Sequence, residues 1–208
     1  MTPSHEPGER AQAPHPDPRE STSPPGDTPL DTMRRVVVIG SGGAGKSTFS
    51  RALAQETGLP LIHLDRHFWR SGWEPTPKEE WNRVVEGLIQ GPEWIMDGND
   101  GGSMEPRLAA ADTVVFLDTP RRTCLARVVR RRLAYGGASR PSLPPGCPER
   151  LTFQFLEWVW SYPTKRRPGI LNRLSELEAD TAVHILRGDP DIEAFMAEAR
   201  EARGPGPG

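Results

Sequence analysis

The residue types between positions 40 and 48 are those of a phosphate-binding loop: glycines, one lysine and several hydroxyl side chains, in the order Gly40, Ser41, Gly42, Gly43, Ala44, Gly45, Lys46, Ser47 and Thr48. Glycines allow successive backbone N–H groups to curl around a phosphate chain, and the helix that follows adds its own unpaired amides. Lys46 supplies a positive charge for the β- and γ-phosphates, and the Ser47 hydroxyl supplies an oxygen ligand for Mg²⁺. We therefore predict that this segment binds a nucleoside triphosphate together with its metal ion.

The lysine in this loop is unusual for the chain. Only Lys46, Lys78 and Lys165 are lysines among the 26 basic residues, so arginine serves at the other basic positions. A compact ammonium group fits between two phosphates better than a planar guanidinium does. The alternative, a glycine turn that binds nothing, is therefore disfavoured.

Three aspartates directly follow short apolar runs, and this placement makes them candidates for the same site. Asp65, Asp97 and Asp118 each end such a run. Ligands of parallel sheets bind beyond the carboxyl ends of the strands, so all three acids are expected on the ligand side. Asp97 and Asp118 are the candidate carboxylates for Mg²⁺. Asp65 is a candidate base or orienter for the hydroxyl group of an acceptor, and a turn-capping aspartate is an equally good interpretation.

Basic residues are concentrated between positions 121 and 173. This stretch holds eleven arginines and one lysine against Glu149 and Glu157, a net charge of +10 in a chain whose net charge is −2. Such a region faces an anionic partner, and the phosphates of a nucleotide are favoured over nucleic acid. About half of the arginines between 121 and 140 are expected to be solvated or paired. Arg107 is a further candidate ligand contact, from the opposite side, and the basic residues Arg140, Lys165, Arg166 and Arg167 are expected to line the insert described next.

Five short apolar runs alternate with helical stretches, which indicates an α/β fold with a parallel sheet and helices on both faces. The expected strands are 36–39, 61–64, 94–96, 113–117 and 182–186, and the expected helices include 121–134 and about 191–203. A lid-like helical insert at about 135–168 contains a Gly/Pro-rich loop and an aromatic helix at 151–161 that is apolar nearly all round and is therefore expected to be buried. The six tryptophans are expected to pack in the core or the insert. His63 and His184, within apolar strands, are expected to be satisfied core residues.

The ends of the chain differ in composition from its middle. Residues 1–33 hold eight prolines and few large apolar residues, so we predict a disordered arm, and the Gly/Pro-rich tail 204–208 is expected to be flexible. Residues 34–203 are sufficient for one domain with its own core. The arm lacks the apolar core of a secretory signal, no stretch approaches the length of a membrane span, and two cysteines are too few for a disulfide framework. We therefore expect a cytoplasmic protein.

Several motifs together resemble the small adenylate-kinase-related P-loop proteins often labelled DNA topology modulation protein (FlaR type). These motifs are the phosphate loop, Leu64-Asp65, Trp94-Ile95-Met96-Asp97-Gly98-Asn99, Phe116-Leu117-Asp118, the spacing from Arg127 to Arg131, and Pro148-Glu149-Arg150. The resemblance covers residues 34–200. It implies a three-layer P-loop NTPase fold of the nucleoside-kinase type, with strand order 2-3-1-4-5, an arginine-bearing lid and Mg·ATP as phosphoryl donor.

The resemblance also implies roles for individual side chains. Asp97 looks like the aspartate of the Asp-Gly pair at the end of the third strand, whose carboxylate acts on the Mg²⁺ shell, so Ser47 and Asp97 are the expected metal ligands, ahead of Asp118. Arg127 and Arg131 match the Arg-x-x-x-Arg on the helix that leads into the lid and contacts the nucleotide and its transferring phosphoryl group. Lys46 and Asp65 complete the expected catalytic set.

The chain departs from adenylate kinases where those enzymes bind the acceptor nucleotide. It reads Leu64-Asp65-Arg66-His67-Phe68-Trp69-Arg70 after the second strand, and Asn99-Asp100 stand where a Pro-Arg completes the adenylate kinase motif. We therefore predict an ATP-dependent phosphotransferase that acts on an unidentified small-molecule acceptor, a nucleotide, a nucleoside or another hydroxylated compound, as a monomer or homodimer. The competing interpretation is an ATP-hydrolysing regulatory protein associated with DNA topology, although the residues spell no base-reading module.

Overall fold

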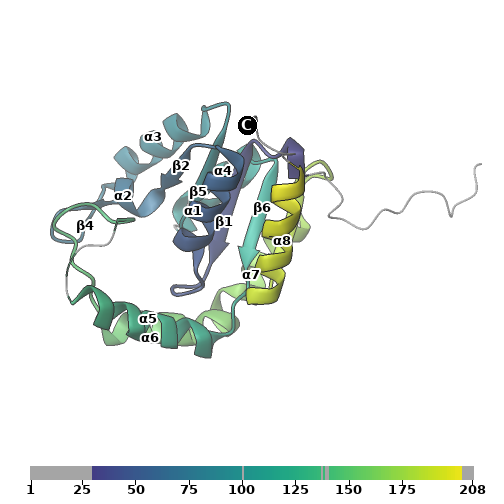
Figure 1. Ribbon diagram of the computed structural model, residues 1–208. Helices are drawn as coiled ribbons and strands as arrows, with labels where there is room; N and C mark the ends of the chain where they lie inside the picture. The colour runs from purple at the N-terminus through teal and green to yellow at the C-terminus, as the bar shows by residue number, and fades with distance from the viewer. Residues whose placement is uncertain (1–29, 100, 137, 139–140, 203–208) are drawn as a thin grey trace, which may run out of the picture.

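A five-stranded parallel sheet with strand order β2-β5-β1-β6-β7 forms the centre of the computed structural model (Figure 1), which describes residues 30–99, 101–136, 138 and 141–202. Its strands are β1 Arg35–Gly40, β2 Leu61–His63, β5 Trp94–Asp97, β6 Thr113–Leu117 and β7 Ala182–Leu186. Numbered by their order along the chain, the five strands of this sheet follow the predicted order 2-3-1-4-5.

The central strand β1 is apolar because both of its faces are covered. Residues 36–39 have no exposed surface, as expected for a strand of a parallel sheet between two helical layers. Burying each such side chain contributes about 1.5–3 kcal/mol. Strand β1 pairs in parallel with β5 and β6, with Val38 beside Asp97 and Gly40 beside Leu117. The phosphate loop therefore leaves the sheet between the ends of β5 and β6.

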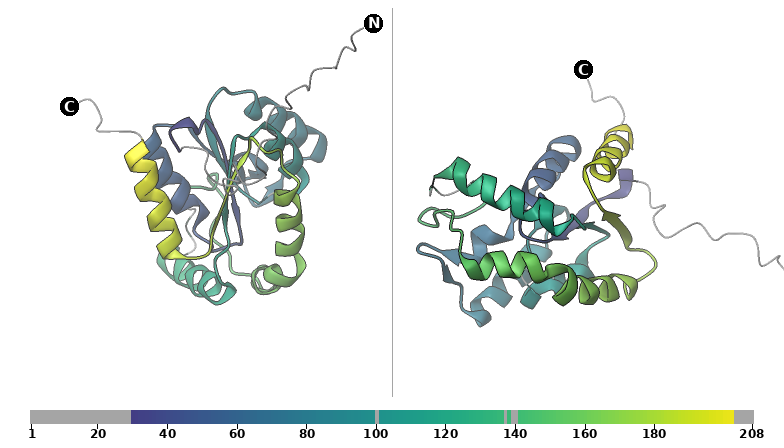
Figure 2. Two further views of the ribbon diagram at one scale, coloured as in Figure 1. Left: turned by 90° about the vertical axis from the view of Figure 1, so that its right-hand side faces the viewer. Right: turned by 90° about the horizontal axis from the view of Figure 1, so that it is seen from below.

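Helices cover both faces of the sheet, which gives three layers (Figure 2). Helices α1 (Lys46–Thr57) and α8 (Asp189–Ala202) lie on one face, where Phe49, Leu53 and Phe195 pack on the strands. Helices α3 (Lys78–Ile89), α4 (Met104–Ala110) and α7 (Arg167–Ser175) lie on the other face. This arrangement leaves the carboxyl ends of the strands available for a site.

Helices α5 (Arg121–Tyr135) and α6 (Phe153–Lys165) pack side by side across that end of the sheet (Figure 1). The inner side of α6 presents Phe155, Trp158 and Val159 to the core, whereas Phe153 is 83% exposed and Trp160 is 47% exposed. The prediction of a buried helix therefore holds for its inner side and was wrong for its outer side. Its outer aromatic residues face solvent, and Trp160 is covered in part by the guanidinium of Arg121, 4.0 Å from the ring centroid.

Several short elements escaped prediction. Strand β2 ends at His63. Leu64, the last residue of the expected strand, instead begins helix α2 (Leu64–Phe68), where its side chain is buried against Gly98. A hairpin of β3 (Trp69–Arg70) and β4 (Glu74–Pro75) follows, and the short 3-10 helix η2 (Gly101–Ser103) precedes α4.

The ends of the described chain bear on the predicted domain limits. A 3-10 turn, η1 (Leu30–Thr32), packs against α8, and Met33 is buried. The folded part thus begins before residue 33, where the predicted arm was placed to end, because Leu30 and Met33 offer apolar surface that the rest of the arm lacks. The remainder of that arm and the predicted tail 204–208 lie outside the described residues. Among the helices that the structure describes, none combines the length and apolar character needed to cross a bilayer.

Candidate functional site

The phosphate loop is a tight turn whose glycines are required by packing as well as by backbone conformation. Gly43 and Gly45 have φ values of 81° and 102°, a region that side chains disfavour. A Cβ at Gly43 would overlap the carbonyl oxygen of Cys124 in α5, and one at Gly42 would lie 2.7 Å from Cζ of Phe155 in α6. Helices α5 and α6 therefore press directly on the loop.

Lys46 and Asn99 both bind the backbone at the end of β1. The Lys46 ammonium donates to the carbonyl oxygens of Gly40 (2.8 Å) and Ser41 (3.1 Å). The Asn99 side chain accepts a hydrogen bond from the Gly40 N–H (3.1 Å) and donates one to the Gly40 carbonyl. Asn99, at the carboxyl end of β5, thus ties this strand to the loop.

A cavity of about 1130 Å³ brings the predicted site residues together. Residues 42–48 of the loop line it, while Gly40 and Ser41 lie deeper, at the buried end of β1. The other predicted residues that line it are Asp65, Asp97, Arg127 and Arg131. These residues come from the phosphate loop and from α1, α2, β5 and α5, so the fold brings every predicted site residue except Gly40 and Ser41 to the wall of one cavity.

Asp97 is the carboxylate placed to take part in a Mg²⁺ site. Its side chain lines the cavity with that of Ser47, is 5% exposed, and has Oδ1 2.7 Å from His63 Nδ1. Carboxylate and hydroxyl oxygens suit Mg²⁺, which is usually held by one or two carboxylates together with substrate phosphates. The Ser47 and Asp97 side chains therefore fit this ion.

Asp118, the alternative metal ligand, is engaged elsewhere. Arg167 donates to both of its carboxylate oxygens, with distances of 2.8 Å from Nε to Oδ1 and 2.8 Å from Nη2 to Oδ2. This bidentate pair raises the pKa of Arg167 and fastens α7 to the end of β6. Asp118 thus has a cationic partner and does not line the cavity, whereas Asp97 does; the choice of Asp97 as metal ligand stays a prediction.

Both predicted lid arginines face the cavity, and carboxylates hold both of them. Arg127 donates to the two Asp189 oxygens (2.6 and 2.9 Å) and to the Ala44 carbonyl of the phosphate loop (3.3 Å). Arg131 donates through Nε to Glu149 (2.7 Å), whose side chain is 4% exposed. The two arginines are thus held beside the loop.

The other described basic residues that the sequence singles out do not line this cavity. Arg107 is fully buried, and its guanidinium donates to the backbone carbonyls of Ser103 (3.0 Å) and Gly98 (3.3 Å). The prediction that Arg107 contacts a ligand was therefore wrong, because its side chain binds the backbone next to η2 and β5 instead. Arg166 lies 5.1 Å from the ring centroid of Trp158, and Arg167 binds Asp118. Arg140 lies outside the described residues.

Sequence reasoning missed several residues at the site. His63, expected to be a satisfied core residue, has the carboxylate of Asp97 as its partner. Trp69, Trp73 and Trp158 pack against other aromatic rings, in line with the expectation for the tryptophans, and they also line the cavity. The Ser71-Gly72 pair between aromatic residues was an available turn signal for the hairpin that carries Trp69 and Trp73.

The two cysteines behave as the sequence indicates. Both are free and buried, and burial raises the pKa of the Cys124 thiol. Cys124 packs beneath the phosphate loop, with its sulfur 3.5 Å from the Thr119 carbonyl oxygen. It is therefore a neutral packing residue.

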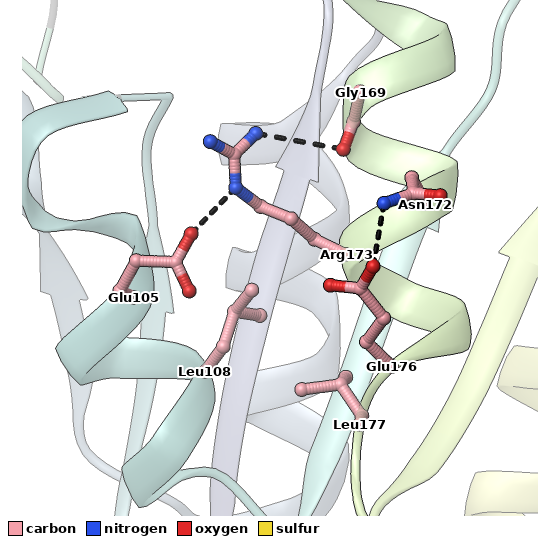
Figure 3. Close-up of a pocket in the computed structure, with 7 residues that line it drawn as sticks. All are labelled: Glu105, Leu108, Gly169, Asn172, Arg173, Glu176 and Leu177. Carbon is pink, nitrogen blue, oxygen red and sulfur yellow. Dashed lines mark hydrogen bonds and ion pairs between the residues drawn. The ribbon is translucent and has the colours of Figure 1, made fainter.

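A second hollow, of about 530 Å³, lies between α4 and α7 on the opposite side of the sheet from α1 and α8 (Figure 3). Arg173 crosses it to Glu105 (2.5 Å), and the side chains of Leu108 and Leu177 also line it. The Arg173 and Glu105 side chains are 46% and 69% exposed, so this ion pair lies at the surface. The predicted site residues all belong to the larger cavity.

Comparisons with known proteins point to kinases. The chain is 27% identical over 172 residues to a shikimate kinase of Paramagnetospirillum magneticum, an alignment that covers 74% of this chain and 84% of that protein. It is 29% identical over 139 residues to shikimate kinase 1 of Yersinia enterocolitica, covering 59% of this chain and 76% of that one. No family model matches.

A solved structure shares the fold. The shikimate kinase of Acinetobacter baumannii in complex with shikimate superposes with a TM-score of 0.53 at 18% identity, over 81% of this chain and 92% of that one. The chain thus has the P-loop kinase fold that the sequence predicts, and its relatives support a phosphotransferase. The DNA topology group, which the motifs resemble, is not shown by these comparisons.

Proposed function

We propose that this protein transfers the γ-phosphoryl group of Mg·ATP to a hydroxyl group of a small molecule bound in the same cavity. One observation carries the proposal: the phosphate loop, Asp65, Asp97 and the lid arginines line a single cavity of about 1130 Å³. Pockets for one small ligand have volumes of about 300–1000 Å³. The cavity therefore has room for a donor and an acceptor side by side.

In the proposed reaction, the acceptor hydroxyl oxygen forms a bond to the γ-phosphorus while the bond from that phosphorus to the β,γ-bridging oxygen breaks. ADP leaves, and the hydroxyl proton passes to a base. Asp65 is our candidate for that base or for the group that orients the hydroxyl, because it lines the cavity from the first turn of α2. Phosphoryl transfer otherwise demands mainly positioning and positive charge.

Positive charge surrounds the expected position of the phosphates. The Lys46 ammonium donates a hydrogen bond to the Gly40 carbonyl at the start of the loop, and Arg127 donates one to the Ala44 carbonyl within the loop. Arg131 lies one helical turn farther along α5, on the same side. In our proposal these cations stabilise charge on the transferring group, and Mg²⁺ held by Ser47 and Asp97 would neutralise part of the phosphate charge.

Shikimate is the first acceptor to test, because it is the substrate named for the relatives and the ligand named for the superposed structure. The competing DNA role draws less support from the geometry. Arg127 and Arg131 of the basic region line the same cavity as the phosphate loop, and Arg167 is bound to Asp118, which leaves these three less free to contact phosphodiesters on an outer surface.

Phosphorus NMR of Mg·ATP with a panel of nucleosides, nucleotides and shikimate tests the proposal. We expect a new phosphoester signal with one member of the panel, formed at the rate at which ADP appears. Lys46→Ala should abolish this transfer, whereas Lys78→Ala, which removes an exposed lysine at the start of α3, should leave it unchanged. Equal transfer by the wild type and Lys46→Ala would contradict the proposal.

A further inference from the structure

The aromatic hairpin β3–β4 contains an uncommon backbone conformation. Trp73 has a φ of 68°, and within the described residues it is the one non-glycine side chain with a positive φ. A conformation of this kind persists where neighbouring contacts fix it, and it is commonly found at ligand sites. Its ring lines the cavity together with that of Trp69.

Two sets of contacts hold Trp73 in place. The first is a ladder of edge-to-face rings that runs from the buried Trp81 through Phe68 and Trp69 to Trp73, with centroid separations of 5.2, 4.8 and 5.3 Å. The second is a hydrogen bond from Trp73 Nε1 to the Pro148 carbonyl (3.0 Å). A ring anchored in this way offers a rigid surface to the cavity.

The segment 146–150 packs against this hairpin and places the Arg150 guanidinium next to it. The Gly72 N–H donates to the Gly146 carbonyl (2.9 Å), and Cys147 Sγ donates to the Arg70 carbonyl (3.1 Å). Arg150, two residues beyond the partner of Trp73, has its guanidinium 5.9 Å from the Trp73 ring centroid and lines the cavity. A flat surface and a positive charge therefore lie side by side.

Part of the positive charge that lines the cavity has no carboxylate partner among the described residues. Arg130 and Arg150 both line the cavity and are exposed, and in the part of the chain that the structure describes neither pairs with a carboxylate. Arg127 and Arg131, by contrast, each have an acidic partner. An anionic group on the ligand would supply the missing charge.

We propose that Trp69, Trp73 and Arg150 form the acceptor subsite, and that it takes a hydroxylated compound with a flat, conjugated ring and an anionic group. The inference rests on the proposed kinase function and names its acceptor class. The ring stacks on the hairpin tryptophans, the anionic group meets Arg150, and a hydroxyl group points toward Asp65, four residues before Trp69 on the adjoining helix. A ring that is not flat, such as that of shikimate, would use this surface poorly.

Three matched probes separate these features. Gallate and shikimate both carry a carboxylate and three adjacent hydroxyl groups, but only the gallate ring is flat, and pyrogallol is flat without the carboxylate. Calorimetric titrations would be made with and without saturating Mg·AMP-PNP, a non-hydrolysable ATP analogue. We expect gallate to bind about tenfold more tightly than either of the other two.

The chain offers a matched control, because Arg121 and Trp160 form a second arginine–tryptophan pair on the outer surface. Trp73→Leu should weaken gallate binding about tenfold, and Trp73→Phe should retain it, whereas Trp160→Leu should have no effect. Arg150→Gln should remove the preference for gallate over pyrogallol, and Arg121→Gln should preserve it.

Gallate that binds no better than shikimate, or that binds Trp73→Leu as well as the wild type, would overturn this acceptor class. Such a result leaves the kinase proposal standing if Mg·AMP-PNP itself binds. Failure of Mg·AMP-PNP to bind the wild type would instead remove the kinase proposal, while the titrations without nucleotide still decide whether the aromatic subsite exists.

Discussion

Replacing Gly43 by alanine tests whether α5 shapes the phosphate loop. Gly43 has a φ of 81°, so any side chain there adopts a left-handed conformation that costs about 1–2 kcal/mol. The added Cβ would also overlap the Cys124 carbonyl oxygen and lie 2.9 Å from Cγ2 of Val128, and both residues are fully buried. Overpacking of this kind costs about 1–3 kcal/mol. Together, Gly43→Ala should lower the free energy of unfolding by about 2–5 kcal/mol.

Gly136→Ala is the matched control. Gly136 also has a left-handed conformation, with a φ of 54°, but a Cβ there would meet no atom within 4 Å among the described residues. Its expected cost is therefore backbone strain alone, about 1 kcal/mol. Because Gly136 ends α5 away from the phosphate loop, nucleotide affinity should not change.

Urea denaturation and calorimetric titration with Mg·ADP measure the two effects separately. For Gly43→Ala we expect the larger loss of stability and at least a tenfold, or about 1.4 kcal/mol, loss of Mg·ADP affinity, because the loop must shift to relieve the overlap. If Gly43→Ala matched Gly136→Ala in both measurements, the contact between α5 and the loop would not constrain the loop as described.

Three further changes probe the site and its support. Asp97→Asn should remove most of the Mg²⁺ dependence of ADP binding, measured by titration with and without the metal, whereas Asp118→Asn should preserve it; equal effects would refute the choice of Asp97. Arg167→Met removes the bidentate partner of Asp118, whose side chain is 14% exposed. The free energy of unfolding, measured by urea denaturation, should fall by about 1–2 kcal/mol, a value kept low because the arginine is partly exposed. No loss would show that this pair is not stabilising. Burial lowers the pKa of His184, against the opposing effect of Glu198, so acid protonates this histidine in the unfolded chain before it does so in the folded one. Stability should therefore fall as the pH decreases below about 7.5, and His184→Gln should reduce that fall; an unchanged pH dependence would contradict it.

The parts of the fold that depend on local patterns could be predicted. The runs of β-branched residues in β1 and β6 predict buried strands, and the Gly/Lys/Ser spacing predicts the phosphate loop with its helix. The preference for Asp97 over Asp118 came from the family resemblance and stays a prediction, because β5, which ends at Asp97, and β6, which Asp118 follows, both lie beside β1.

The remaining features depend on contacts between segments far apart in the sequence. Trp69 and Trp73 looked like packing residues because residue type alone does not reveal that segment 146–150 covers their hairpin. The ion pairs of Arg127 with Asp189 and of Arg131 with Glu149 join residues that share no local pattern. The apolar residues of α6 extend around the helix and therefore predict burial, yet no described element packs on its outer side, where Phe153 and Trp160 are exposed.

Calorimetric titration of Mg·AMP-PNP into the wild type, Lys46→Ala and Lys78→Ala tests most directly that the cavity is a triphosphate site. One molecule should bind per chain of the wild type and of Lys78→Ala with equal affinity, and Lys46→Ala should bind at least about tenfold more weakly, because a charge-assisted contact is lost. Binding to Lys46→Ala with the affinity of the wild type would contradict the assignment of this loop as the donor site.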